Sequence, residues 1–289
     1  MEKKVGVMIN IQHYIPQEPL NSFIKHMVYI RGNSSNSYIK ELPEGSTNLV
    51  IELNENTTNT IYEDSNLKNK KAIKHAWISG MQKQAILYEN NPNSVIISIR
   101  FTIGGFYQLT GIPISLIKQN GIEAETVLGN SFRDLYQQLL NTKIIFNKFL
   151  VLETYFEKYT ISQSRENNIV PFVIKNLEKN INWLVHKSGY SQKHIIQVLK
   201  KQTGFAPKYL QRIDRFNQLT QAIQIQKGKI DWFFLVEKFG YHDQAHLIKD
   251  FSHFSGSKPT DYQKSQILLE ENSLVPDMIL QPQDLQLII

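Results

Sequence analysis

The 289-residue sequence contains no cysteine, and nowhere do about 18 apolar residues run together, as a membrane-spanning helix requires. The absence of cysteine excludes disulfides, thiolate metal sites, zinc knuckles, cysteine nucleophiles and methyl-accepting repair chemistry. The first twenty residues also contain no apolar run long enough for a signal peptide. We therefore expect a cytoplasmic protein that has no membrane partner.

Signatures of catalysis are scarce as well. Gly104-Gly105 lacks the further spaced glycines and the Lys-Ser/Thr pair of a phosphate-binding loop, so a turn is favoured there. His242 lies four residues before His246, but no carboxylate or third histidine completes a metal site. No arrangement of serine, histidine and acid points to a hydrolase. The sequence predicts a protein that is not an enzyme and holds neither a metal nor a cofactor.

Charge is present but unevenly spread. The whole chain carries a net charge of +6, with 41% hydrophobic and 20% charged residues, which is ordinary for a globular protein. Residues 168–266 carry 15 Lys and Arg against 7 Asp and Glu, a net +8, and the remainder carries 17 against 19, a net −2. A basic segment suits a nucleic-acid surface. A solvated, lysine-rich helical surface gives the same count, so charge alone leaves both interpretations open.

The N-terminal half has the pattern of a β-rich domain. From Leu20 to about Ile103, short apolar runs alternate with glycine, asparagine and proline turns. The predicted strands are 26–32, 47–54, 75–82, 83–89 and 94–102. Helical spacing follows in 106–119, 131–141 and 147–159, with Ser131 as the N-cap of the second helix. These patterns predict a sandwich or small barrel with following helices.

From Val170 the pattern is helical almost throughout. Residues 160–169 are polar and aperiodic, which predicts a linker. We therefore expect an α+β chain with a β-rich sensor or dimerisation domain at 1–159, an all-α domain at 170–264 and a tail at 265–289.

Two segments of the all-α domain are related copies of one helical unit: GYSQKHIIQVLKKQTG begins at Gly189 and GYHDQAHLIKDFSHF at Gly240. Ser191 aligns with Asp243 at an offset of 52 positions. Each copy supplies a supporting helix, a glycine turn and an N-cap, Ser191 or Asp243, which are the parts of a helix-turn-helix. A helix of about 20 residues joins the copies and spans roughly 30 Å. That length is close to the ~34 Å between successive major-groove faces.

The second helix of each copy divides into a core face and an outward face. The outward residues that we expect to contact DNA are Lys193, Ile196, Gln197 and Lys200 in the first copy, and Gln244, Ala245 and Lys249 in the second. Glutamine can read adenine, lysine can reach guanine or phosphate, and alanine or isoleucine can contact a thymine methyl. His194 and His246 occupy equivalent positions, which favours a shared structural task over metal ligation.

With these motifs, residues 170–264 resemble the DNA-binding domain of AraC-type (AraC/XylS) transcriptional regulators. The resemblance implies that the outward residues of the two repeat helices read bases and that the protein activates transcription, which makes RNA polymerase a partner. The sequence departs from the family pattern at Gln197, where an arginine is common, and at Val185 and Val236, which replace alanine. We expect the two repeat helices to contribute unequally to specificity.

Residues 14–140 resemble, more weakly, a sensor-like domain attached to some of these regulators, through ELPEGSTNLVIEL, WISGMQ and ISIRFTIGGFYQLTGIP. This resemblance implies effector binding or dimerisation. Trp77 and Arg100 are candidate effector-binding residues, with the arginine pairing an anionic group. A core aromatic and a surface charge are the alternative roles for these two residues.

The sequence thus predicts an effector-responsive transcriptional regulator that binds double-stranded DNA, a small-molecule effector and a second copy of itself. The alternative from another class is a small-molecule-binding protein whose helical half contacts only proteins.

Overall fold

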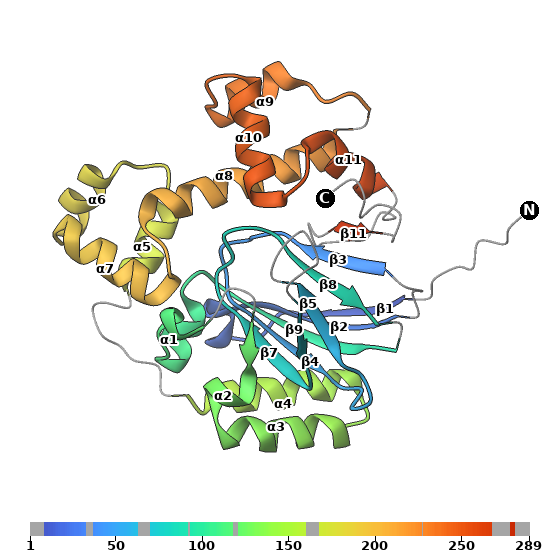
Figure 1. Cartoon of the computed structure of the whole chain (residues 1–289). Helices are drawn as coiled ribbons and strands as arrows, with labels where there is room; N and C mark the ends of the chain where they lie inside the picture. Colours follow the sequence, from blue (N-terminus) through green and yellow to red (C-terminus); the bar gives the residue numbers. More distant parts are fainter. Residues whose placement is uncertain are drawn as a thin grey trace, which may run out of the picture.

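The computed structural model describes residues 9–32, 37–62, 70–91, 93–117, 121–159, 168–226, 228–267 and 278–280. Figure 1 shows a β-rich N-terminal part with helices on its lower side and a helical C-terminal part that extends from its left side to above it. The predicted α+β fold class is confirmed, and the β-rich part is a sandwich of two antiparallel sheets.

The first sheet has the strand order β1-β2-β9-β4-β7-β10. Its strands are β1 at Ile9–Tyr14, β2 at Ile24–Gly32, β4 at Asn48–Glu52, β7 at Ala76–Ser79, β9 at Val95–Phe101 and β10 at Ile122–Glu123. Every residue of β4 is buried because both faces of this sheet are covered. Leu49 and Ile51 join the core beneath the sheet, whereas Val50 packs in the core between the sheets.

The second sheet has the order β11-β3-β8-β5-β6. Its strands are β3 at Ser37–Glu41, β5 at Asn59–Tyr62, β6 at Lys70–Ile73, β8 at Ile86–Asn90 and β11 at Met278–Leu280. The five predicted strands correspond to β2, β4, β7, β8 and β9. The other strands escaped prediction because they are short or carry charged residues such as Lys40 and Glu41, which are buried here.

Helices follow the sheets in the N-terminal part. They are α1 at Gly105–Thr110, a short 3-10 helix at Ile114–Leu116, α2 at Ala124–Leu128, α3 at Asn130–Asn141 and α4 at Ile145–Glu157. The single helix predicted over 106–119 is wrong, because Gly111 ends α1 at a φ of 72° and Pro113 follows. Ser131 lies inside α3 and donates to Leu128 O instead of capping the helix, and Gly129 holds the N-cap position.

The C-terminal part is helical, as predicted. Its helices are α5 at Ile169–Lys175, α6 at Ile181–Ser188, α7 at Gln192–Thr203, α8 at Pro207–Ile225, α9 at Trp232–Phe239, α10 at Gln244–Ser255 and α11 at Pro259–Ile267. Residues 160–167 of the expected linker lie outside the described residues. Among the helices that the structure describes, none combines the length and the apolar character needed to cross a membrane.

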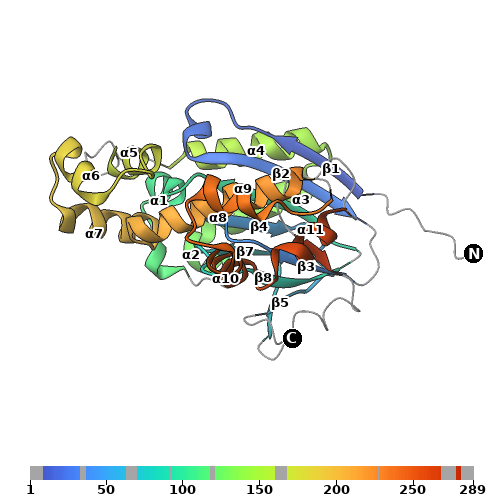
Figure 2. The same cartoon turned by 90° about the horizontal axis from the view of Figure 1, so that it is seen from above.

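Two pieces of the fold connect distant parts of the chain. From the expected tail, β11 pairs antiparallel with β3, with Ile279 opposite Ile39. One apolar core also joins the halves, since Leu42, Met81 and Leu87 of the β-rich part pack with residues of the helices. The β-rich part therefore packs directly against the helical part (Figures 1 and 2).

Candidate DNA interface and ligand cavity

The two predicted helix-turn-helix units are built from the same local devices. In the first unit α6 ends at Gly189, which has a φ of 73°, and Ser191 Oγ accepts a hydrogen bond from the His194 backbone N–H at 3.2 Å. In the second unit α9 ends at Gly240, with a φ of 64°, and Asp243 Oδ1 accepts from the His246 backbone N–H at 2.7 Å. Each cap satisfies a backbone donor that the helix start leaves unpaired.

The equivalent histidines contact equivalent tyrosines. The His194 ring lies 5.0 Å from that of Tyr190, and the His246 ring lies 5.3 Å from that of Tyr241. No group of three or more potential metal ligands occurs among the described residues. Both copies therefore pack the histidine of the second helix against the tyrosine that follows the glycine turn.

Asp250 anchors the second unit to the long helix, and sequence reasoning missed it. Its carboxylate accepts from Arg212 Nη2 at 2.6 Å, from Arg215 Nη2 at 3.3 Å and from the Tyr241 hydroxyl at 3.2 Å. The carboxylate lies on the buried side of α10, with 6% of the residue exposed. The sequence did contain a signal for this role: Asp250 lies on the apolar face of its helix, at the position where the first copy has Val198.

The outward residues of α7 and α10 lie largely in solvent. In α7, Lys193, Gln197 and Lys200 are exposed and Ile196 is half-buried, while in α10 Gln244, Ala245 and Lys249 are all exposed. Figure 1 shows these helices near opposite ends of α8, whose 19 residues span about 28 Å. Two helices with exposed polar outward faces thus lie near the two ends of one connecting helix.

The C-terminal ends of α7 and α10 both contact the β-rich part. Gln108 Nε2 of α1 donates to Gln202 Oε1 of α7 at 3.3 Å, and the Ala85 N–H donates to Phe254 O of α10 at 2.8 Å. Beside the second contact, Lys40 Nζ donates to Ser257 Oγ at 2.7 Å, and burial lowers the pKa of Lys40 to about 8. The β-rich part therefore contacts the C-terminal ends of both α7 and α10.

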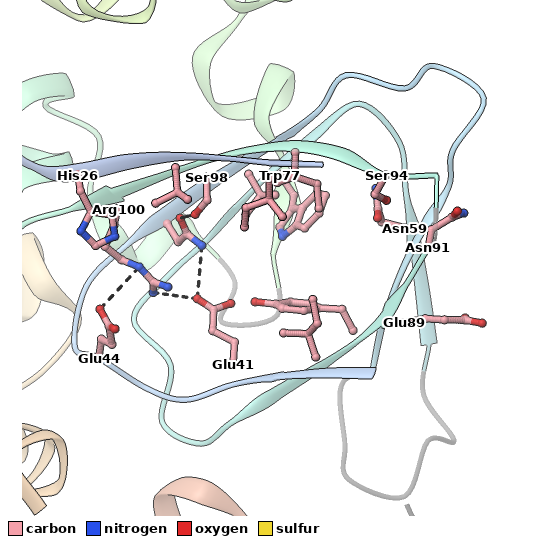
Figure 3. Close-up of a pocket in the computed structure, with 17 residues that line it drawn as sticks. His26, Glu41, Glu44, Asn59, Trp77, Glu89, Asn91, Ser94, Ser98 and Arg100 are labelled. Atoms are coloured by element: carbon pink, nitrogen blue, oxygen red, sulfur yellow. Dashed lines mark hydrogen bonds and ion pairs between the residues drawn. The ribbon is translucent and has the colours of Figure 1, made fainter. Parts of the chain in front are cut away.

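A cavity of about 110 Å³ lies between the two sheets. Trp77 and Arg100, the predicted effector residues, both line it (Figure 3). Its apolar wall consists of Val28, Ile30, Ile39, Val50, Trp77, Tyr88 and Ile96. The structure thus brings together two residues that the sequence left apart, in a space that also holds charged groups.

The polar end of the cavity is an ion-pair cluster. Arg100 Nη1 donates to Glu41 Oε1 at 2.8 Å, and Arg100 Nε lies 3.7 Å from Glu44 Oε2. Burial raises the pKa of the Glu44 carboxyl, but Arg100 and Lys25 outweigh it, so the pKa is lowered overall. Burial, with Arg100 beside it, lowers the pKa of His26 to about 4, so His26 is neutral at pH 7.

Sequence reasoning missed Glu41, Glu44 and His26 as cavity residues. We expected Arg100 to pair with an anionic group of a ligand. In the structure its guanidinium already pairs with the carboxylates of Glu41 and Glu44. Glu41 and Glu44 flank a proline in the ELPEG segment, where the sequence showed only a turn.

One family model and several curated proteins are similar to parts of this chain. The family described as "Domain of unknown function (DUF6597)" matches residues 12–123. The "Multiple antibiotic resistance protein MarA" of Escherichia coli (strain K12) is 24% identical over 112 residues, covering 38% of this chain and 87% of MarA. MarA of Salmonella typhimurium (strain LT2) is 23% identical over the same length.

Similar solved structures include ToxT from Vibrio cholerae, at a TM-score of 0.41 and 11% identity, covering 92% of this chain and 99% of ToxT. The AraC-like transcriptional activator CuxR has a TM-score of 0.30 and 11% identity, covering 73% of this chain and 86% of CuxR.

Two capped helix-turn-helix units on one long helix define the class of DNA-binding transcriptional regulators. Within this class, the chain resembles the AraC/XylS type, as its sequence motifs and its similarity to MarA indicate.

Proposed function

We propose that this protein is a cytoplasmic, sequence-specific regulator that reads two adjacent major grooves with α7 and α10. The observation that carries the proposal is the pair of capped helices, each with an exposed polar face, at the two ends of α8. A helix of about 19 residues matches the spacing of grooves on one side of a duplex.

The outward residues have the chemistry for distinct roles in that complex. Gln197 and Gln244 can each pair with adenine, and Ile196 and Ala245 can contact thymine methyl groups. Lys193, Lys200 and Lys249 supply cations for guanine or for phosphates. Gln197 replaces the arginine common in AraC-type proteins, so we expect α10 to dominate specificity.

Binding of the full chain to fragments of its own promoter region tests the DNA proposal. Affinity should fall steeply as salt rises, because phosphate contacts release counterions. Gln244→Ala combined with Lys249→Ala should weaken specific binding by at least tenfold, since each paired base contact contributes about 1–3 kcal/mol. Gln137→Ala with Lys143→Ala is the matched control on the β-rich part, where both residues are exposed. Unchanged affinity and base preference in the α10 variant would refute the groove assignment.

We also propose that the β-rich part senses an effector and that the response activates transcription. Support comes from the turn beside the cavity: Glu44 lines the cavity, and its backbone oxygen accepts a hydrogen bond from Asn217 of α8. A ligand that moves this turn would therefore act on the helix that carries both units. The same proposal includes homodimerisation and contact with RNA polymerase. It also includes the domain limits 1–159, 170–264 and 265–289, with a linker at 160–169.

One observation favours the alternative of a helical half that contacts only proteins. Phe233 and Phe234 of α9 are 80% and 45% exposed, and adjacent exposed aromatic side chains are suited to contact with another protein. The alternative predicts no shift of any promoter fragment and no occupancy in a genome-wide footprint.

A further inference from the structure

The cavity between the sheets contains more buried negative charge than positive charge. Glu41 and Glu44 flank the single guanidinium of Arg100, and His26 is neutral at pH 7. Lys25 Nζ approaches Glu44 at 3.6 Å, but its side chain is 58% exposed and water screens it. One carboxylate charge at the polar end is therefore left without a buried cation.

Glu41 directs that excess charge into the cavity. Its Oε1 accepts from Arg100 and, at 3.4 Å, from Asn48 Nδ2. Its Oε2 has no hydrogen-bond partner among the described residues. Water cannot readily take that place, because only 2% of Glu41 is exposed. A buried acceptor without a donor is costly, so a ligand that supplies an N–H group would gain a strong, charge-assisted hydrogen bond.

The rest of the cavity lining is mostly apolar, although Trp77 Nε1 is a buried donor that has no hydrogen-bond partner among the described residues. Trp77 is 3% exposed, and its indole faces the space above Glu41 in Figure 3. Trp77 of the first sheet and Tyr88 of the second approach each other across the cavity, with ring centroids 6.3 Å apart, and their π faces can also attract a cation. A dry cavity of about 150 Å³ holds benzene, so a space of about 110 Å³ limits the ligand to a small molecule.

We propose that this cavity binds a small amine with an apolar body, whose N–H group donates to Glu41 Oε2. The inference deepens the proposed function, because it rests on the β-rich part acting as an effector sensor. A carboxylate ligand is disfavoured, since it would meet two carboxylates and an arginine that they already pair.

A charge series on the unaltered full chain tests the ligand class by calorimetry and thermal denaturation. The probes are propylamine and isobutylamine, each with the alcohol and the carboxylate of matching size. We expect at least one amine to bind at least tenfold more tightly than its alcohol and to raise the melting temperature, while neither carboxylate binds. Equal or tighter binding of an alcohol or a carboxylate, or no binding of either amine, overturns the proposal.

Substitution of the acceptor tests the site. Glu41→Gln should weaken amine binding at least tenfold, whereas Glu157→Gln, at an exposed position of α4 outside the cavity lining, should leave it unchanged. Undiminished binding in Glu41→Gln overturns the proposal. Because Glu41→Gln also disturbs the pairing of Arg100, its fold is checked by circular dichroism, and if it does not fold the charge series decides.

A gel shift without amine separates this inference from the DNA proposal. If the protein binds an amine but no DNA, the ligand site is supported and the regulator function is refuted. If it binds DNA but no amine, the regulator function is supported and the ligand site is refuted.

Discussion

Asn217, in the middle of α8, donates a hydrogen bond from Nδ2 to the backbone oxygen of Glu44 at 3.2 Å, although the two residues are 173 positions apart. Next to Glu44, Gly45 has a φ of 79°, and a Cβ on it would lie 3.2 Å from Ile213 of α8. The ion-pair cluster of the cavity and the long helix thus share one short turn.

We predict that Asn217→Ala loosens this contact and lowers the free energy of unfolding by about 1 kcal/mol, the typical contribution of a neutral hydrogen bond. Any effect of a cavity ligand on DNA affinity should shrink in the same variant. Chemical denaturation and gel shifts measure the two effects. Gln221→Ala, at an exposed position of α8, is the control. An intact ligand effect in Asn217→Ala would argue against coupling through this turn.

The Asp250 carboxylate should matter more to stability than any exposed acid of the chain. Asp250→Ala removes the acceptor of Arg212, Arg215 and Tyr241. We expect a loss of about 2–3 kcal/mol, below the full cost of breaking a buried pair because both arginines are about one-third exposed. Urea denaturation checks this, with Asp134→Ala on the surface of α3 as the control. Equal midpoints for the two variants would contradict the prediction.

His26 should make the protein less stable as pH falls from about 6.5 to about 4. Burial and Arg100 lower the pKa of His26 to about 4 from the ordinary 6.5, so within this window the unfolded chain binds a proton that the folded chain rejects. Stability therefore rises with pH through the window and is fully present above 6.5. Because His26 is only half-buried, we expect a loss of about 1–2 kcal/mol.

Denaturation midpoints of His26→Asn across this pH range measure the effect, since the variant should lack that part of the slope. His253→Asn, at an exposed position of α10, serves as the control. The same slope in His26→Asn and in the unaltered protein would show that another group is responsible.

Gly105 should tolerate no side chain. A Cβ there would collide with the backbone oxygen of Phe23 and with Thr102 Oγ1, and backbone cannot move aside easily. We expect Gly105→Ala to cost more than 2 kcal/mol, as overpacking does. Gly111→Ala meets no neighbouring atom and should cost only about 1 kcal/mol, from its φ of 72°. Thermal denaturation ranks the two, and a smaller loss for Gly105→Ala would contradict the close approach.

Much of the helical part could be predicted because its signals are local. The caps Ser191 and Asp243 act on a backbone N–H three residues ahead, and the turns at Gly189 and Gly240 need only one left-handed residue each. The apolar spacing of α7 and α10 then fixes which face is buried. The roles of the outward residues in DNA binding stay predictions.

The cavity and the anchoring of the halves were decided only by the tertiary structure. Antiparallel pairing sets His26 of β2 and Asn48 of β4 opposite Arg100 of β9, while Glu41 comes from the other sheet. A shift of one residue in such a register turns every side chain to the other face, so no local pattern fixes this set. The sequence by itself determined the two capped helices, α7 and α10. Long-range strand pairing and core packing determined the acidic, partly aromatic cavity and joined it to α8, because those contacts link residues that lie far apart along the chain.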